Sequence, residues 1–164
     1  MPQIIKNIHI ENFKSAKNVE LTDCKRINLL IGKPNVGKSN LLEALSLFCL
    51  PFLKYLKKKD LQQFIRVENI SELFCNGNIE NEIKIQADNK KAVLKWLPQN
   101  GIEVNLQYSP TTEEISLPFS STLAFTKKIY LIHRTIRSAV TFFLLLSVRK
   151  AVYRTYCYHL PVAI

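Results

Sequence analysis

The order of apolar and polar residues in the first third of the chain predicts three strands and a helix. Residues 4–11 alternate between apolar and polar positions, and residues 19–21 repeat that pattern over a shorter length. Residues 26–31 form a mostly apolar run, which is typical of a buried strand. A helical pattern follows from residue 38 to about residue 49, and Pro51 then favours a break or kink.

The middle of the chain predicts an antiparallel β meander. Three strand-like segments, 82–87, 92–97 and 102–107, are separated by short turns rich in Asp, Asn and Gly. Trp96 lies in the second of these segments and is expected to pack in the core. Together with the strand and helix before it, the meander predicts an α/β fold that carries an antiparallel β subdomain.

The connection between the third strand and the helix carries a phosphate-binding pattern. It fits G-x-x-x-x-G-K-[ST], the P-loop or Walker A motif, and it lies in the expected strand–loop–helix setting. This setting makes the motif far more specific than the pattern alone, and an ordinary glycine-containing turn is the weaker alternative. The motif reads Gly32-Lys33-Pro34-Asn35-Val36-Gly37-Lys38-Ser39.

The residue types in this motif suit a triphosphate. Gly32 and Gly37 allow the backbone to curl so that successive N–H groups point at phosphate oxygens. The helix that begins near Lys38 adds the positive end of its dipole, and the Lys38 ammonium would reach the β- and γ-phosphates. The Ser39 hydroxyl would bind Mg²⁺. The motif therefore predicts ATP or GTP together with Mg²⁺ as the ligand.

The charge is unevenly distributed along the chain. The net charge is +10, of which +3 belongs to residues 1–117 and +7 to residues 118–164. No stretch approaches the ~20 apolar residues that a membrane helix needs, and the first residues lack the apolar core of a signal peptide. The four cysteines are scattered without a C-x-x-C pair, which favours reduced thiols in a cytoplasmic protein of about one domain.

The last part of the chain has an unusual composition. Residues 115–164 contain no Asp, Glu, Asn, Gln or Gly, although these residue types normally supply the turns of a folded segment. One interpretation is a stretch that is out of the ancestral reading frame or degenerate. The other is a basic amphipathic tail for nucleic acid or an anionic membrane surface. The expected division is a lobe over residues 1–115 and an atypical tail over residues 116–164, of uncertain fold.

The first fifty residues resemble a known family. The element Ile8-His9-Ile10-Glu11-Asn12-Phe13-Lys14-Ser15 stands shortly before the P-loop, which continues as Asn40-Leu41-Leu42-Glu43-Ala44-Leu45. This combination resembles the N-terminal part of ABC-type ATPases of the OLD, RecF and SMC class, including small AAA family ATPases. The resemblance weakens after residue 50 and extends to about residue 115.

The resemblance implies an ATP-binding site with Mg²⁺ and places the "ENFKS" element beside the nucleotide. A lysine just after a strand could also reach a phosphate as a point charge, although an ordinary surface lysine fits equally well without the family. Full-length members of this family dimerise around two nucleotides and often act on DNA. The predicted nucleotide-binding residues are Gly32, Asn35, Val36, Gly37, Lys38, Ser39 and Asn40, with Lys14 and Ser15, and the predicted metal ligand is Ser39.

Three motifs of that family are not found in this sequence. There is no Walker B segment ending in Asp-Glu, no Leu-Ser-x-Gly signature, and no histidine in the context of a switch. Hydrolysis needs groups that hold the metal and position water, in addition to the phosphate loop. The sequence therefore predicts an N-terminal lobe that binds ATP–Mg²⁺ without hydrolysing it alone, and it assigns no catalytic residue.

Two other functions compete with this prediction. A small GTPase also carries G-x-P-N-V-G-K-S, but the Asp-x-x-Gly and Asn-Lys-x-Asp motifs that such enzymes need are missing. A non-enzymatic nucleic-acid-binding module would rely on the basic tail, and its affinity would fall steeply with salt.

Overall fold

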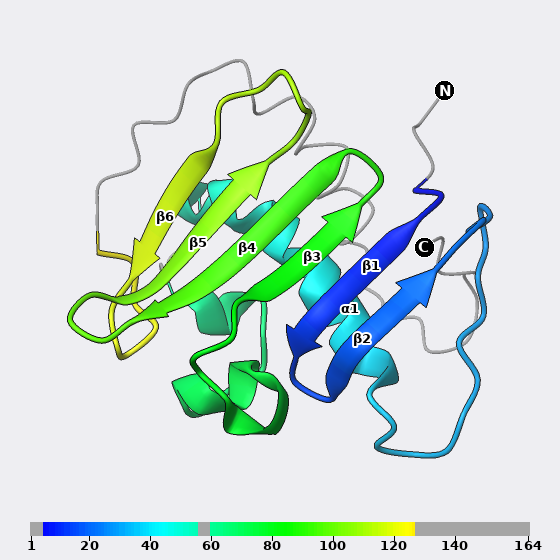
Figure 1. Cartoon of the computed structure of the whole chain (residues 1–164), viewed down its shortest axis with the longest axis horizontal. Helices are drawn as coiled ribbons and strands as arrows, with labels where there is room; N and C mark the ends of the chain where they lie inside the picture. The colour runs from blue at the N-terminus through cyan, green and yellow to red at the C-terminus, as the bar shows by residue number, and fades with distance from the viewer. Residues whose placement is uncertain (1–4, 56–59, 127–164) are drawn as a thin grey trace.

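One six-stranded antiparallel sheet organises the molecule. The computed structural model describes residues 5–55 and 60–126. Its strands follow the order β2-β1-β3-β4-β5-β6, and every neighbouring pair is antiparallel (Figure 1). The strands are β1 (Ile8–Phe13), β2 (Ala16–Leu21), β3 (Ile83–Ala87), β4 (Lys90–Leu97), β5 (Gly101–Gln107) and β6 (Ile115–Phe119).

Within residues 5–55 and 60–126, one α-helix and several 3₁₀ helices accompany the sheet. Helix α1 (Lys38–Ser46) crosses one face of the sheet, where it contacts β1 and β3 (Figure 1). The chain continues directly as a 3₁₀ helix, Leu47–Tyr55, which contains Pro51. The predicted helix is confirmed from residue 38, with the tighter 3₁₀ winding beginning before the proline. Shorter 3₁₀ helices follow at Leu61–Gln63, Ile70–Leu73 and Cys75–Gly77.

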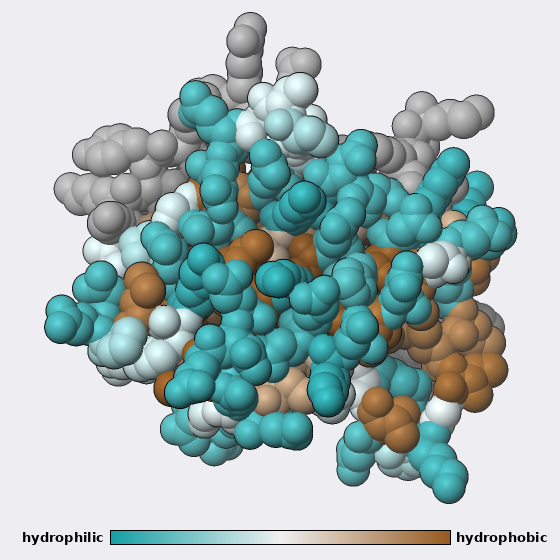
Figure 2. Space-filling model, in the orientation of Figure 1, coloured by the Kyte–Doolittle hydropathy of each residue, from teal (hydrophilic) through white to brown (hydrophobic). Residues whose placement is uncertain are grey.

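The core lies between this helical layer and one face of the sheet. Ile10, Ile85 and Ala92 stand opposite one another on three adjacent strands, and all three are buried. The alternation of apolar and polar residues gives each strand one inward row, so the other face is left for polar side chains. Figure 2 shows that this other face is largely hydrophilic. The largest fully buried side chains include Phe13, Phe48, Phe74 and Phe119.

The predicted meander is confirmed. Strands β3, β4 and β5 pair in sequence through short turns, and β6 extends the sheet beyond them. Gly101 begins β5 with φ +90°, and a Cβ placed there would lie 2.1 Å from the Phe119 carbonyl oxygen, so this position requires glycine. Trp96 is partly buried and packs against the core, whereas Leu94 is fully buried.

The first two predicted strands form a tight hairpin. Strand β1 runs from Ile8 to Phe13, so the prediction for residues 4–11 began too early and ended too early. The prediction for residues 19–21 falls within β2, which is longer at its start. Lys14 and Ser15 form the turn between them, and Lys14 has φ +50°.

The prediction of a buried strand at residues 26–31 is wrong in this structure. These residues belong to no strand, and Ile27, Leu29 and Ile31 are 56%, 80% and 84% exposed. A strand requires a neighbouring backbone to complete its hydrogen-bond ladder, and no strand of the described part of the chain pairs with this segment. Figure 2 shows a hydrophobic group at the lower right, on the side where Figure 1 draws the connection from β2 to α1.

The start of the atypical segment takes part in the sheet. Strand β6 pairs with β5 from Leu106↔Ile115 to Ile102↔Phe119. Residues 127–164 lie outside the described residues, so the division at residue 115 and the nature of the tail remain predictions. Among the helices that the structure describes, none is long and apolar enough to cross a membrane.

Candidate nucleotide-binding site

The loop before α1 contains two residues with left-handed backbone conformations. Asn35 and Gly37 both adopt left-handed conformations, with φ +61° and +89°. Gly37 is the N-cap residue of α1. As a glycine it has no side chain, so it provides no side-chain hydrogen bond to the first N–H groups of the helix. The N–H groups at a helix start need acceptors from outside the helix. An anion placed at this turn would supply them and would meet the positive end of the helix dipole.

The Lys38 side chain folds back across the same loop. Its ammonium donates hydrogen bonds to the carbonyl oxygens of Gly32 (2.9 Å) and Lys33 (2.6 Å). The side chain therefore spans the loop from its last residues and places its positive charge at the first two residues of the motif. Phosphate oxygens are stronger acceptors for an ammonium than neutral carbonyls are.

The β1–β2 turn packs directly against the loop. The Ser15 hydroxyl accepts a hydrogen bond from the Asn40 side-chain amide at 2.9 Å. A Cβ on Gly37 would lie 2.2 Å from the Ser15 oxygen, and the left-handed φ of Gly37 disfavours other residues as well. The structure thus brings together Ser15, Gly37 and Asn40, which the sequence placed in one site.

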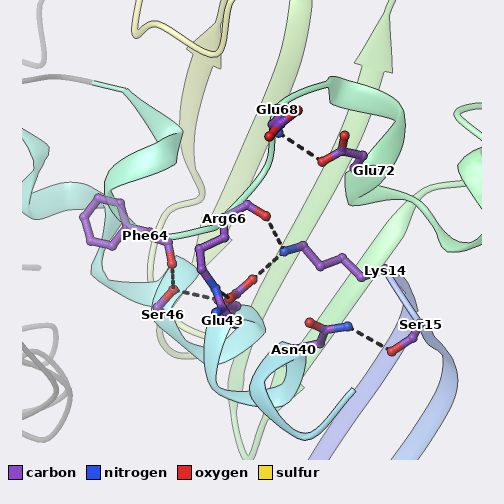
Figure 3. A network of polar contacts seen from close by, with 9 residues as sticks. All are labelled: Lys14, Ser15, Asn40, Glu43, Ser46, Phe64, Arg66, Glu68 and Glu72. Carbon is purple, nitrogen blue, oxygen red and sulfur yellow. Dashed lines mark hydrogen bonds and ion pairs between the residues drawn. The ribbon is translucent and has the colours of Figure 1, made fainter. Parts of the chain in front are cut away.

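Lys14 forms an ion pair with a carboxylate on helix α1. Its ammonium donates to a Glu43 carboxylate oxygen at 2.5 Å and to the Arg66 carbonyl oxygen at 2.7 Å (Figure 3). The sequence left two alternatives open, a lysine that reaches a phosphate and an ordinary surface lysine, and the structure shows its ammonium bound to a carboxylate on α1. Lys14 lies next to Ser15 in the turn and is only 13% exposed.

Glu43 and Arg66 are parts of the site that the sequence analysis missed. Arg66 Nε donates to the second Glu43 oxygen at 2.7 Å, so one carboxylate binds two cations. No clear sequence signal marks this pair, because the residues three and four positions from Glu43 along the predicted helix include Ser39, Asn40 and Ser46, which are polar.

The two cations control the ionisation of Glu43. Burial by itself would raise the pKa of this carboxyl group, because it disfavours the charged form. The hydrogen bonds and charges of Lys14 and Arg66 outweigh that effect, and the pKa is lowered below its ordinary value. Glu43 is therefore ionised at neutral pH and forms a true ion-pair network beside the loop.

The predicted metal ligand fits a nucleotide-bound ion better than a free one. Ser39 lies in the first turn of α1, directly after Lys38. In the part of the chain that the structure describes, no group of three or more His, Cys, Asp or Glu residues could hold a metal ion. Mg²⁺ commonly binds through one or two protein oxygens, several waters and the phosphates of its nucleotide. The donor set fits Mg²⁺ carried by a nucleotide.

Sequence comparisons connect the chain with nucleotide-handling proteins. Residues 4–157 of the chain match the model of the AAA ATPase domain family. The DNA replication and repair protein RecF of Leptospira biflexa is 36% identical over 78 residues, which are 48% of this chain and 20% of that protein. A protein of Helicobacter pylori named ATP/GTP phosphatase is 30% identical over 141 residues, which are 76% of this chain and 36% of that protein.

The relatives are considerably longer than this chain. An uncharacterised protein of Methanocaldococcus jannaschii is 32% identical over 90 residues, which are 51% of this chain and 41% of that protein. The chain therefore spans between about a fifth and two fifths of these curated relatives. The family match covers most of the chain, including the P-loop, the meander and much of the basic segment. This chain belongs to the AAA ATPase domain family.

Proposed function

We propose that this protein binds ATP–Mg²⁺ through residues 32–39. The observation that carries the proposal is the left-handed Gly37 at the start of α1, with the Lys38 ammonium folded across the loop onto the Gly32 and Lys33 carbonyls. This arrangement joins backbone donors, a helix dipole and a mobile positive charge at one place. Membership in an ATPase family supports a nucleotide as the source of the phosphates.

The residues of the loop divide the work of binding. Gly32, Asn35, Val36 and Gly37 shape the backbone so that its N–H groups can face the phosphates. Lys38 neutralises charge on the outer phosphates, and Ser39 supplies a hydroxyl oxygen to the Mg²⁺ that the nucleotide carries. Ser15 and Asn40 brace the loop from the side of the β1–β2 turn through their mutual hydrogen bond. Lys14 lies in the same turn, next to Ser15, and binds Glu43 on α1.

Turnover is proposed to require more than this chain. Hydrolysis needs groups that position the attacking water and hold the metal, and the sequence offers no Walker B or signature motif. The RecF relatives are named for DNA replication and repair, so action on DNA and pairing of two copies around nucleotide are proposals for a larger assembly. Cys24, Cys49 and Cys75 are all free thiols, which supports a cytoplasmic location.

The test compares two lysines of the same loop. Lys38→Ala should weaken ATP–Mg²⁺ binding by about 10- to 100-fold, because it removes charge-assisted hydrogen bonds to phosphate. Lys33→Ala removes the same charge from the same loop but keeps the carbonyl that Lys38 contacts, so it should bind within about twofold of the wild type. Isothermal titration of each variant with ATP–Mg²⁺ measures both affinities. Equal affinities for Lys38→Ala and the wild type would reject the proposed site.

Two further measurements separate the competing functions. Competition of ATP with GTP in the same titration distinguishes an ATP-binding protein from a GTPase-like one. The nucleic-acid alternative depends on the basic residues beyond 126, which lie outside the described residues. A steep loss of DNA affinity with rising salt would favour that alternative, and a flat response would remove it.

A further inference from the structure

One carboxylate beside the loop is buried. Among the described residues, Glu43 is the one acidic side chain in the buried class, at 1% exposed. A buried carboxylate is costly unless it is paired and hydrogen-bonded, so its position calls for a specific role. Glu43 lies one helical turn after Ser39, on the side of α1 that faces Lys14 and Arg66 (Figure 3).

The Glu43 carboxylate connects three separate segments. It lies on α1, one oxygen accepts from Lys14 in the β1–β2 turn, and the other accepts from Arg66 in the connection after Leu61–Gln63. Lys14 also donates to the Arg66 carbonyl oxygen, which closes the triangle. Ser46, one turn further along α1, donates to the Phe64 carbonyl oxygen at 3.0 Å and ties the same connection to the helix.

The β1–β2 turn, which contains Lys14, has an unfavourable backbone conformation that contacts with the rest of the protein must stabilise. Asn12 and Lys14 both have positive φ, +58° and +50°, which is unfavourable for residues with a Cβ. The Lys14 N–H donates to the Leu73 carbonyl oxygen at 2.9 Å, and Phe13 between the two is fully buried. The surroundings therefore fix the turn, and the Lys14–Glu43 pair is one of its links to α1.

The same turn presents Ser15 to the phosphate loop. Ser15 directly follows Lys14, and its hydroxyl lies so close to Gly37 that a Cβ would overlap it. Asn40 donates to that hydroxyl from the first turn of α1, one turn before Glu43. Helix α1 therefore binds the turn at two points: Asn40 donates a hydrogen bond to Ser15, and Glu43 accepts one from Lys14.

We propose that Glu43 is a positioning residue for the phosphate loop: it anchors Lys14 so that Ser15 stays packed against Gly37, and this contact sets the affinity for nucleotide. The affinity clause rests on the proposed function of residues 32–39. Glu43 itself contacts no phosphate in this scheme, and Lys14 acts as its counterpart in the turn. Lys14 is then the residue through which Glu43 anchors the turn. This role is compatible with the position beside the nucleotide that its motif implies.

The experiment uses Glu43→Gln in the full chain, with two controls. Glu43→Gln keeps the size of the side chain but removes the charge that holds Lys14. Glu72→Gln makes the same chemical change nearby, at an exposed residue whose carboxylate accepts from the Glu68 N–H, whereas the Lys14 ammonium donates to Glu43 and to the Arg66 carbonyl oxygen. Val104→Ala removes buried volume from β5, away from the loop, and controls for a general loss of stability.

Amide hydrogen exchange is the first readout, because it does not depend on nucleotide. In Glu43→Gln, peptides that cover residues 12–16 and 33–40 should exchange faster than in the wild type, while a peptide from residues 90–107 should not change. Neither control should produce that pattern. Arg66→Gln provides a milder variant because its side chain is 71% exposed, and it should accelerate the same two peptides to a smaller extent. Unchanged exchange at residues 33–40 in both variants would overturn the proposal.

ATP–Mg²⁺ affinity is the second readout. Glu43→Gln should bind roughly tenfold more weakly than the wild type, and both controls should bind as the wild type does. Unchanged affinity in a folded Glu43→Gln protein would overturn the link between Glu43 and the loop. If the wild type itself binds no ATP, the proposed function fails instead, and the exchange pattern still decides whether Glu43 positions the turn.

Discussion

The meander and the segment before the phosphate loop contain similar apolar residues in opposite environments. Leu94 in β4 is fully buried, and its strand has a hydrogen-bonded neighbour on each side. Leu29 is 80% exposed, and its segment pairs with no strand of the described part. The difference teaches that apolar residues produce a strand only where neighbouring backbones complete the ladder and cover the side chains.

The two regions are also held by different forces. The meander depends on apolar packing between its inward face and the helical layer, which is insensitive to charge. The phosphate loop is held on its flank by polar contacts, namely Asn40 with Ser15 and Glu43 with Lys14 and Arg66. Substitutions and pH should therefore affect the two regions in different ways.

The largest effect is expected in the meander. Leu94→Ala should lower the free energy of unfolding by about 2–5 kcal/mol, because it removes a fully buried side chain and leaves a cavity. Urea denaturation followed by circular dichroism measures this loss. A loss below about 1 kcal/mol would mean that the sheet and helical layer are packed loosely at β4.

A smaller and pH-dependent effect is expected at the loop. The pKa of Glu43 is lowered from 4.5 in the folded protein, since the bonds from Lys14 and Arg66 outweigh the opposing effect of burial. Its ionised form therefore adds stability above the unfolded pKa, and this stability is lost as the pH falls through the folded pKa. Replacing Glu43 by Gln should cost about 2 kcal/mol at neutral pH, the scale of hydrogen bonds to charged groups.

Urea denaturation between about pH 7 and about pH 3 tests whether the stabilisation by Glu43 is lost as the pH falls. The difference in the free energy of unfolding between the wild type and Glu43→Gln should become smaller once the pH falls below about 4.5, the ordinary pKa of this group. The gap between the wild type and Leu94→Ala should stay constant, because no titrating group is removed. A Glu43 gap that is independent of pH would show that the carboxylate contributes through packing alone.

Local sequence patterns predicted the parts of the fold whose partners are close in the chain. Strands β3, β4 and β5 pair with their sequence neighbours through short turns, so alternation and turn residues were sufficient to identify them. The helix start at Lys38 followed from the P-loop motif. The pairing of β1 with β3 could not be predicted, because it joins residues that are 73 to 79 positions apart, from Glu11↔Lys84 to Ile8↔Ala87, and leaves no local signal.

The candidate site shows the same limit. Gly37, Lys38 and Ser39 are consecutive, and a motif predicted their arrangement together with the neighbouring "ENFKS" element. The Lys14–Glu43–Arg66 network joins three distant segments, and spacing alone could not reveal that Lys14 binds a carboxylate. No apolar helix face marks Glu43 in the sequence, and only the fold shows that this carboxylate is buried and therefore needs a cation as its partner.

The smallest effect is expected at Leu29, and it is the most direct test of the comparison. Leu29→Ala removes the same atoms as Leu94→Ala, but from a side chain that is 80% exposed. Exposed substitutions away from special features usually change stability by no more than about 0.5 kcal/mol, so urea denaturation should barely distinguish this variant from the wild type. If Leu29→Ala instead cost as much as Leu94→Ala, residues 26–31 would be buried in solution, and the strand that the sequence predicts there would be real.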